Sequence, residues 1–301
     1  MSDIADFPEI KDLFLPKDDS HKGQNGRLLI IGGSHLFHAA SLWALKVASR
    51  IVDLVHYSSI PENNRIVQKL KEEFRDGIVV PREEIENYIE EDDCILIGPG
   101  MVRTEGRGLG MINSKLGIKN IKEINDKKDE GLQTYYLTKY LLRKYPHKRW
   151  VIDAGALQML DLNDIPENAI LTPHLGEFEG LEAKNSTLTI KNKTLKERVK
   201  NFAFLYKCIV LLKGKVDIVA CGDKVKEIKG GNAGMTKGGT GDVLAGLVAG
   251  IYCKNNAWLS AVTASFINKK SSEELFETKG YWYNASDLAD QIPKTMKQII
   301  L

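Results

Sequence analysis

The chain has 301 residues, of which 43% are hydrophobic, and its 42 lysines and arginines nearly balance 40 aspartates and glutamates. A formal charge of +2 excludes a strongly basic protein that binds nucleic acid by neutralising phosphates, and it excludes an acidic disordered chain. A chain of this size and hydrophobicity buries a large core, and its length allows one large α/β domain or two smaller ones.

The amino-terminal end and the cysteines indicate a cytoplasmic protein. The first ten residues lack the basic start and apolar core of a secretory signal, and no stretch of about 18 apolar residues is present to cross a membrane. We expect Cys94, Cys208 and Cys253 to be small buried residues of a reducing compartment. With no C-x-x-C pair and no H-x-x-x-H pair in the chain, a zinc site is not expected.

Strand-like and helix-like segments alternate along the chain. Apolar runs predict buried strands at residues 28–31, 52–57, 94–97, 150–152, 169–172 and 209–212, and a hairpin of 216–220 with 224–228. Helical patterns predict helices at 39–50, from Pro61 onward, and at 242–253, 258–276 and 286–300.

Near-continuous apolar strands separated by helices are typical of a mostly parallel sheet that is covered on both faces. Most polar or glycine clusters directly follow a strand, at the edge where such sheets bind ligands. No linker divides the chain, so we expect a single three-layer α/β domain over residues 1–301. The lysine-rich stretches 101–128 and 184–200 are interpreted as solvated loops or helix faces, with the first as an alternative flap over the site.

The most informative segment is the glycine cluster at residues 230–242, GGNAGMTKGGTGD, which leads into an amphipathic helix near Gly241. Glycines let successive amides point the same way, and the positive end of a helix adds to this anion site. Such a site suits a phosphate, or an oxygen that gains charge during phosphoryl transfer. The spacing fits neither a Walker loop nor a G-x-G-x-x-G fingerprint. Asp242 at the helix start is either a cap or a catalytic base.

The segment GNAGMTKGGTGDVLAG at 231–246 resembles the signature of the NAD(P)H-hydrate dehydratases, a branch of the ribokinase-like superfamily. Further segments agree in the order of that family: HKGQNGRLLIIGGS at 21–34, IGPGM at 97–101, VIDAGAL at 151–157, LTPHLGE at 171–177 and LLKGKVD at 211–217. The resemblance covers residues 20–255. It implies a three-layer ribokinase-like fold with a mostly parallel central sheet and helices on both faces.

The resemblance also implies an activity, the repair of NADH and NADPH that have been hydrated at the nicotinamide ring (NADHX and NADPHX). The ring hydroxyl is phosphorylated by ADP, or by ATP in eukaryotic relatives, with Mg²⁺, and phosphate is then eliminated. Many relatives carry an additional epimerase domain, for which the ~20 residues before His21 are too few. We therefore expect the dehydratase alone, as a homo-oligomer (dimer to tetramer) that binds neither nucleic acid nor membrane.

Residue roles follow from the same resemblance. Asp242 would accept the proton of the ring hydroxyl as it attacks the terminal phosphate, while Gly239, Thr240 and Gly241 would donate amides to the phosphate in transit. The substrate would contact Ala40, Gly100, His174, Asn232 and Asp242. The nucleotide would contact Lys213, Gly214, Lys215, Val216, Asp217, Lys237 and Gly241. Glu177 would bind Mg²⁺ through a water molecule.

Structural alternatives remain open for several of these residues. Lys237 is otherwise a solvated loop lysine, His174 a cap after Pro173, and Glu177 a first-turn carboxylate that complements a helix dipole. The segment 213–217 is otherwise an ordinary β-turn. Ala40 is otherwise a position where a helix packs closely on a strand, and Gly100 a turn glycine.

Two departures from the family pattern bear on the site. Gly155 stands where the family has the second acid of D-A-D-A-L, which leaves Asp153 as the only carboxylate there. Ala39 replaces a glycine, and its methyl group is expected to narrow the substrate groove. The competing hypotheses are a small-molecule kinase of the same superfamily, for a thiamine or pyridoxal precursor, and a catalytically silent nucleotide-binding protein. Those kinases more often carry Asn in place of His174, and the intact Asp242 and glycine cluster speak against a silent protein.

Overall fold

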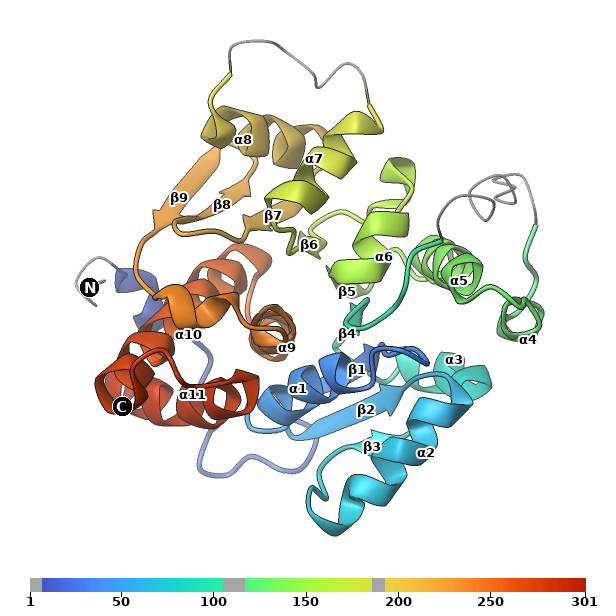
Figure 1. The fold of residues 1–301 in the computed structure, drawn as a ribbon, viewed down its shortest axis with the longest axis horizontal. Coiled ribbons are helices and arrows are strands. Elements are labelled where there is room, and N and C mark those ends of the chain that lie inside the picture. The colour runs from blue at the N-terminus through green and yellow to red at the C-terminus, as the bar shows by residue number, and fades with distance from the viewer. Residues whose placement is uncertain (1–6, 105–116, 186–192) are drawn as a thin grey trace.

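The protein is described by a computed structural model that covers residues 7–104, 117–185 and 193–301. Within these ranges nine strands form one sheet in the order β3-β2-β1-β4-β5-β6-β7-β8-β9 (Figure 1). The strands are β1 (Arg27–Ile31), β2 (Leu54–Ser58), β3 (Ile78–Val79), β4 (Cys94–Ile97), β5 (Arg149–Ile152), β6 (Ile170–Leu171), β7 (Ile209–Leu212), β8 (Asp217–Cys221) and β9 (Lys224–Ile228).

The pairing confirms the predicted mostly parallel sheet. All neighbours from β3 to β7 pair in parallel, and only the β8–β9 hairpin adds antiparallel strands at one edge. In β1, Leu28 and Ile30 enter one hydrophobic core while Leu29 and Ile31 enter the other. Because alternate side chains of a strand point to opposite faces, this division places one core on each side of the sheet.

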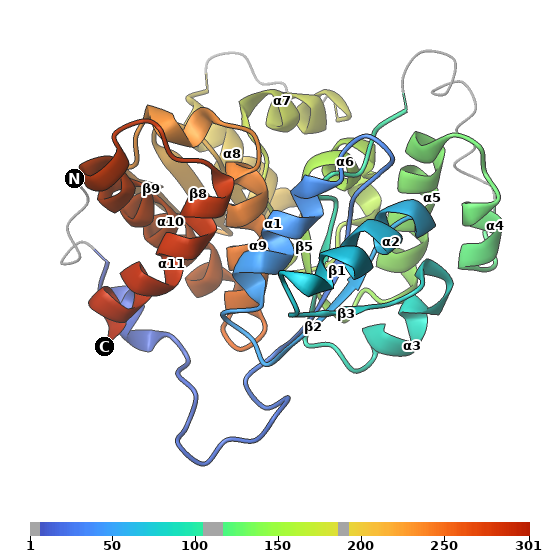
Figure 2. The ribbon, with the colours of Figure 1, turned by 60° about the horizontal axis from the view of Figure 1, so that its bottom comes forward.

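Helices cover both faces, so the predicted three layers are confirmed. The first core includes side chains of α1 (Ala39–Ala48), α2 (Pro61–Lys69), α9 (Thr240–Tyr252), α10 (Ala257–Lys279) and α11 (Ala285–Ile300). The second includes side chains of α3 (Ile85–Ile89), α4 (Ile121–Asn125), α5 (Glu130–Lys144), α6 (Ala154–Met159), α7 (Leu175–Ala183) and α8 (Leu195–Leu205). Figure 2 shows α1, α9, α10 and α11 packed side by side.

Several predicted boundaries were wrong by a few residues. Helix α9 begins at Thr240 rather than at Asp242, α1 ends at Ala48, and α10 runs on to Lys279. The two-residue strand β3 was not predicted, because its apolar run ends after Val80 at a proline. In the second lysine-rich stretch, α8 starts at a capping box in which Thr194 and Glu197 bond each other's backbone amides. That reciprocal pair, rather than apolar periodicity, marks where the helix begins.

Residues 105–116 of the predicted flap lie outside the described part of the chain, whereas its residues 121–125 form α4. The three cysteines expected in the core, Cys94, Cys208 and Cys253, are buried. Within the described ranges, no helix has the length and apolar character needed to cross a lipid bilayer.

The topology brings five predicted motifs to one edge of the sheet. Strands β1, β4, β5, β6 and β7 are consecutive neighbours, and each is followed by a motif at its carboxyl end. These motifs are Gly32-Gly33, Gly98-Pro99-Gly100, Asp153, Thr172-Pro173-His174 and Lys213-Gly214. Helix α9, on the first face, directs its amino-terminal end to the same edge (Figure 1).

The contact between α1 and α9 fixes where that end lies, and it generates a first prediction. A Cβ atom at Gly246 of α9 would lie 2.6 Å from Ala44 O and 2.7 Å from Ala44 Cα. We expect Gly246→Ala to lower the free energy of unfolding by about 1–3 kcal/mol, although alanine is the better helix former. Denaturant unfolding measures this change.

The matched control is Gly180→Ala in α7, where a Cβ would meet no atom within 4 Å. This variant is expected to be as stable as the unmodified protein or more stable by up to about 1 kcal/mol. Equal effects of both substitutions would contradict the close α1–α9 packing.

Candidate active site

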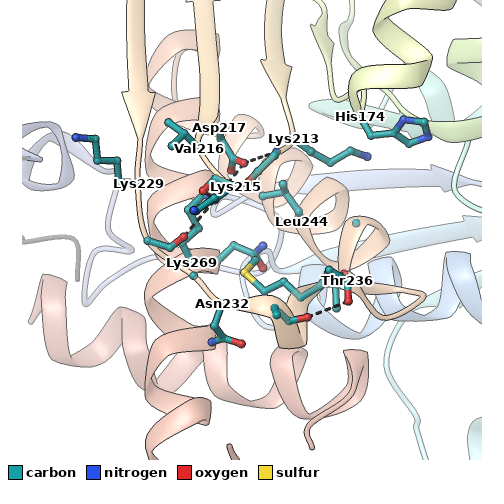
Figure 3. Close-up of a pocket in the computed structure, with 18 residues that line it drawn as sticks. His174, Lys213, Lys215, Val216, Asp217, Lys229, Asn232, Thr236, Leu244 and Lys269 are labelled. Carbon is teal, nitrogen blue, oxygen red and sulfur yellow. Dashed lines mark hydrogen bonds and ion pairs between the residues drawn. The ribbon is translucent and has the colours of Figure 1, made fainter. Parts of the chain in front are cut away.

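A cavity of about 840 Å³ opens at this edge of the sheet, between the β7–β8 turn, the glycine cluster and α10 (Figure 3). It is lined by most of the predicted nucleotide residues and by three other predicted residues: Lys213, Gly214, Lys215, Val216, Asp217 and Gly241, with His174, Asn232 and Thr240. The structure therefore gathers predicted residues that are up to 67 positions apart in the sequence around one space of a size typical for small-molecule sites.

The glycine cluster ends in a left-handed residue that starts α9. Gly239 is the N-cap with φ of 93°, and a Cβ there would lie 2.3 Å from the ring of Trp43. Only glycine fits this conformation and this contact. The Thr240 hydroxyl lies 2.6 Å from Met235 O and 2.9 Å from Lys237 O, which closes the turn. The amides that follow belong to the first turn of the helix, where they have no intrahelical acceptor and suit an anion.

Asp242 is not the cap of α9, because Gly239 occupies that position and no side chain caps the helix. Its carboxyl group lies in the first turn. Burial, and after it the nearby Asp153 carboxylate, raise the pKa of Asp242 to about 7, although the Lys213 ammonium acts in the opposite direction. A carboxylate with a pKa near neutrality is suited to accept and release a proton at physiological pH.

Lys213 and Asp153 form an ion pair that the sequence analysis missed. The Lys213 ammonium lies 2.9 Å from Asp153 Oδ1, to which the Thr172 hydroxyl also donates at 2.7 Å. The same ammonium lies 3.5 Å from the place where a Cβ of Gly241 would be. It therefore lies beside the start of α9. Burial opposes its charge, but the carboxylates around it, first that of Asp153, outweigh burial and raise the pKa of Lys213.

His174 and Glu177 cap α7, which matches the structural alternatives that were open for them. His174 Nδ1 accepts from the Glu177 amide at 3.2 Å, and Glu177 Oε2 accepts from the His174 amide at 2.9 Å. Because Nδ1 is an acceptor, the proton of the neutral ring is on Nε2. The His174 side chain is 60% exposed at the cavity, whereas that of Glu177 is only 6% exposed. The cap thus leaves the histidine ring available to a ligand.

The turn at the end of β7, which was predicted to bind the nucleotide, is held in place by hydrogen bonds and an ion pair. Asp217 Oδ1 accepts from the Gly214 amide at 2.8 Å and Oδ2 from the Ser265 hydroxyl at 2.7 Å. Lys269 of α10 lies 3.2 Å from Asp217 and donates to Gly214 O at 3.0 Å. Lys269 was not predicted, because its neighbours Asn268 and Lys270 are also polar and the sequence does not distinguish it from a solvated lysine. These contacts make the segment more than an ordinary β-turn.

The side chains of Asn232 and Lys237 make contacts with other groups of the protein. Asn232 Oδ1 accepts from the Gly234 amide at 2.9 Å and from the Tyr283 hydroxyl at 2.8 Å. The Lys237 ammonium donates to Tyr281 O and lies over the Tyr283 ring. Lys237 is absent from the residues that line the cavity.

Ala40 and Gly100 lie beside each other, outside the lining of this cavity. A Cβ at Gly100 would lie 2.9 Å from the Ala40 Cβ and 2.8 Å from Phe37 O, so the two loops pack closely. A Cβ at Gly155 would lie 2.0 Å from Met101 O. Gly155 stands where the family has its second acid. Because it has no side chain, the backbone that follows β4 can pack directly against it.

The described residues contain no cluster of three histidine, cysteine or acidic side chains that is placed to bind a metal ion. Glu177 Oε1 accepts from Gln158 Nε2 at 3.0 Å, and Oε2 accepts from the His174 amide. Since a carboxylate oxygen has two acceptor sites, each oxygen retains one for a water molecule.

The sheet order and the two layers of helices define a ribokinase-like fold. The chain superposes on a ribokinase-like superfamily protein from Enterococcus faecalis with a TM-score of 0.76 and 21% identity, covering 97% of this chain and 94% of that one. It also resembles the ADP/ATP-dependent NAD(P)H-hydrate dehydratase of Bacillus subtilis, solved with ATP and Mg²⁺, with a TM-score of 0.72, 22% identity and 96% of each chain covered.

The family model for NAD(P)H-hydrate dehydratase matches residues 28–294. The ADP-dependent (S)-NAD(P)H-hydrate dehydratase of Nitrosopumilus maritimus is 32% identical over 94% of this chain and 93% of its own length. The bifunctional NAD(P)H-hydrate repair enzyme of Methanocaldococcus jannaschii is 35% identical over 98% of this chain, which spans only 52% of that relative. The chain belongs to the NAD(P)H-hydrate dehydratase family, and it spans about half the length of its bifunctional relatives.

The raised pKa of Asp242 generates a prediction for stability. An aspartate with an ordinary pKa of about 3.9 in the unfolded chain and about 7 in the fold binds its proton more tightly when folded. The stability gained from that proton is present below the ordinary pKa and is lost as the pH rises through 7, by roughly 4 kcal/mol at most. Asp242→Asn removes this loss. Thermal unfolding should show a variant whose advantage in Tm grows between pH 5 and pH 8.

Asp223→Asn is the control, because Asp223 is an exposed aspartate in the β8–β9 turn. Its Tm should follow that of the unmodified protein at every pH. A constant difference between Asp242→Asn and the unmodified protein would contradict the assigned environment.

Proposed function

We propose that this protein is an ADP-dependent (S)-NAD(P)H-hydrate dehydratase. It transfers the terminal phosphoryl group of ADP to the hydroxyl of the hydrated nicotinamide ring, which leaves AMP. Phosphate and a proton are then eliminated from the ring, which restores its double bond. The observation that carries the proposal is the position of Asp242 in the first turn of α9, directly after the anion-binding turn and beside the Lys213 ammonium. A relative of nearly the same length bears this activity in its name.

In the proposal the nucleotide occupies the cavity of about 840 Å³. The turn at the end of β7 binds it through Lys213, Gly214, Lys215, Val216 and Asp217. Its terminal phosphate meets Gly241 and the amides of Gly239 and Thr240. Lys237 is left out of this set, because its ammonium is engaged by Tyr281 O.

The hydrated ring lies over Asp242, which accepts the proton of the attacking hydroxyl. His174 donates from Nε2, while Gly100 and Ala40 form the adjoining wall by backbone and methyl contact. The side-chain oxygen of Asn232 already accepts two hydrogen bonds. In the proposal this residue therefore holds the glycine cluster in place on the side where the substrate binds.

Magnesium fits this site in one way. A Mg²⁺ ion usually keeps several waters and is held by one or two carboxylates together with substrate phosphates. Glu177 retains one acceptor site on each oxygen, so it would hold a water of such an ion. The ion, when bound, would neutralise charge on the phosphates. A homo-oligomer of two to four copies and a cytoplasmic location complete the proposal and rest on the family resemblance.

The kinase alternative has less support. The hydroxyethylthiazole kinase of Pyrococcus horikoshii shares the fold with a TM-score of 0.57 at 14% identity, which concerns the fold alone. The family model spans residues 28–294 and is that of the dehydratases.

The proposed activity is tested with hydrated NADH and NADPH, each supplied as both epimers, with ADP and ATP in parallel. We expect the reduced-nicotinamide absorbance to return with ADP, together with release of one phosphate per molecule repaired. No return with either nucleotide would overturn the proposal, and a return with ATP alone would overturn the choice of donor.

The ion pair of Lys213 and Asp153 generates a prediction for the pH profile. Asp153 raises the pKa of Asp242, so Asp153→Asn should lower that pKa and move the acidic limb of kcat/KM from about 7 to a lower pH. The limb rises with pH because Asp242 acts as a base. The value of kcat should also fall, since Lys213 loses the partner that orients it. Initial rates between pH 5 and pH 9 measure both effects.

The exposed Asp223→Asn again serves as the control and should leave the limb in place. A loss of rate in Asp153→Asn with an unmoved acidic limb would mean that Asp153 only supports the fold.

A further inference from the structure

A second cavity of about 510 Å³ adjoins the first and shares His174 with it. Its walls come from α7, from the end of α6 and from Arg103 and Thr104 after β4. The proposed substrate is a dinucleotide, whereas Asp242 acts on only one of its two halves. A cavity of this size, joined to the site at His174, has room for the other half.

The electrostatic character of the second cavity is positive. Lys184 lies on its wall and donates to Gln158 O at 2.8 Å and to Leu160 O at 2.7 Å, which holds its ammonium in place. Arg103 also lines the cavity, and its guanidinium donates to Gln158 Oε1 at 3.4 Å. Among the described residues that line the cavity, Glu177 is the one carboxylate. Two cations therefore face a single negative charge, and this excess of positive charge suits an anionic ligand.

The shape of the wall points to a ligand as well. Gly176 and Gly180 lie four residues apart, on the same face of α7. A Cβ at Gly180 would meet no atom within 4 Å, so the fold does not require glycine there. Glycine in a helix costs about 1 kcal/mol relative to alanine. The two glycines leave this side of α7 without side chains, so that a bound molecule has room to lie against the helix backbone.

Hydrogen bonds connect the two cavities. Gln158 approaches Arg103 through Oε1 and donates to Glu177 through Nε2, and Glu177 in turn accepts from the amide of His174. The cationic wall of the second cavity is thus linked to the histidine that borders the first one.

We propose that this second cavity binds the half of the dinucleotide substrate that does not react, with Arg103 and Lys184 as partners of a phosphate group on it. The inference rests on the proposed function. Arginine binds phosphate oxygens with two parallel hydrogen bonds, and lysine acts as a point charge. Two phosphate groups have this chemistry, the bridging diphosphate of both hydrates and the 2′-phosphate that only NADPHX carries.

The test uses Arg103→Gln and Lys184→Gln, with KM and kcat measured for NADHX and NADPHX at saturating ADP. We expect KM for the hydrate to rise about 10-fold or more, as for the loss of a charged hydrogen bond, with little change in kcat or in KM for ADP. A rise for NADPHX alone identifies the 2′-phosphate, and an equal rise for both hydrates identifies the diphosphate. An unchanged KM for both hydrates would overturn the proposal.

A third variant does not depend on the charged side chains. Gly180→Leu projects a side chain into the second cavity from a position with open space around it. It should raise KM for both hydrates and leave KM for ADP unchanged, while Gly180→Ala should have a smaller effect. The matched controls are Arg75→Gln and Lys294→Gln, which remove exposed cations outside both cavities.

Direct binding separates this inference from the proposed function. Calorimetry with NAD⁺ and NADP⁺ in the presence of ADP reports on the cavity without any turnover. If the unmodified protein repairs neither hydrate, the proposed function fails, but weaker NADP⁺ binding in Gly180→Leu and Arg103→Gln would still support the second cavity. Equal binding by the unmodified protein and these variants would overturn it.

Discussion

The ion pair between Lys213 and Asp153 joins the carboxyl ends of β7 and β5 across the short strand β6. The Thr172 hydroxyl, which follows β6, donates to the same carboxylate. Three neighbouring strands therefore meet in one polar contact at the edge of the sheet that carries the candidate active site. This contact holds the Lys213 ammonium next to Gly241, and the electrostatic environment of Asp242 depends on that ammonium. The close contact of α1 with α9 at Gly246 supplies the other constraint, because it sets how far α9 reaches toward that ammonium.

The proposed function requires a chain with a formal charge of +2 to bind heavily phosphorylated molecules, and this arrangement is compatible with that requirement. Anion binding is assigned to amides at the start of α9 and to a few fixed ammonium and guanidinium groups, each in a separate place. Lys213 is balanced by Asp153, and Lys269 by Asp217. In the second cavity Arg103 and Lys184 play the corresponding part. Positive charge is thus local and partly neutralised, so no extended basic surface is needed.

Much of the fold could be predicted from the sequence, because the apolar runs at 28–31 and 94–97 are buried on both faces and leave little choice of structure. The two-residue strand β3 could not, since its pairing depends on β2 rather than on its own residues. The glycine cluster and Asp242 were recognised because the turn demands glycine at Gly239. The partner of Lys213 was missed, as 60 residues separate it from Asp153 and only the strand order brings them together. Lys237 was placed at the phosphates by its position in the cluster, but its side chain turns toward Tyr281.

The central claim is that Asp242 is a base for phosphoryl transfer and not a structural residue of α9. Single-turnover transfer of the terminal phosphate of ADP to hydrated NADPH by Asp242→Asn, with ADP affinity measured on the same protein, tests it most directly. We predict ADP binding within a few-fold of that of the unmodified protein and a rate of transfer lower by about 100-fold to 10,000-fold. Transfer at a near-normal rate by a folded, ADP-binding variant would contradict the account.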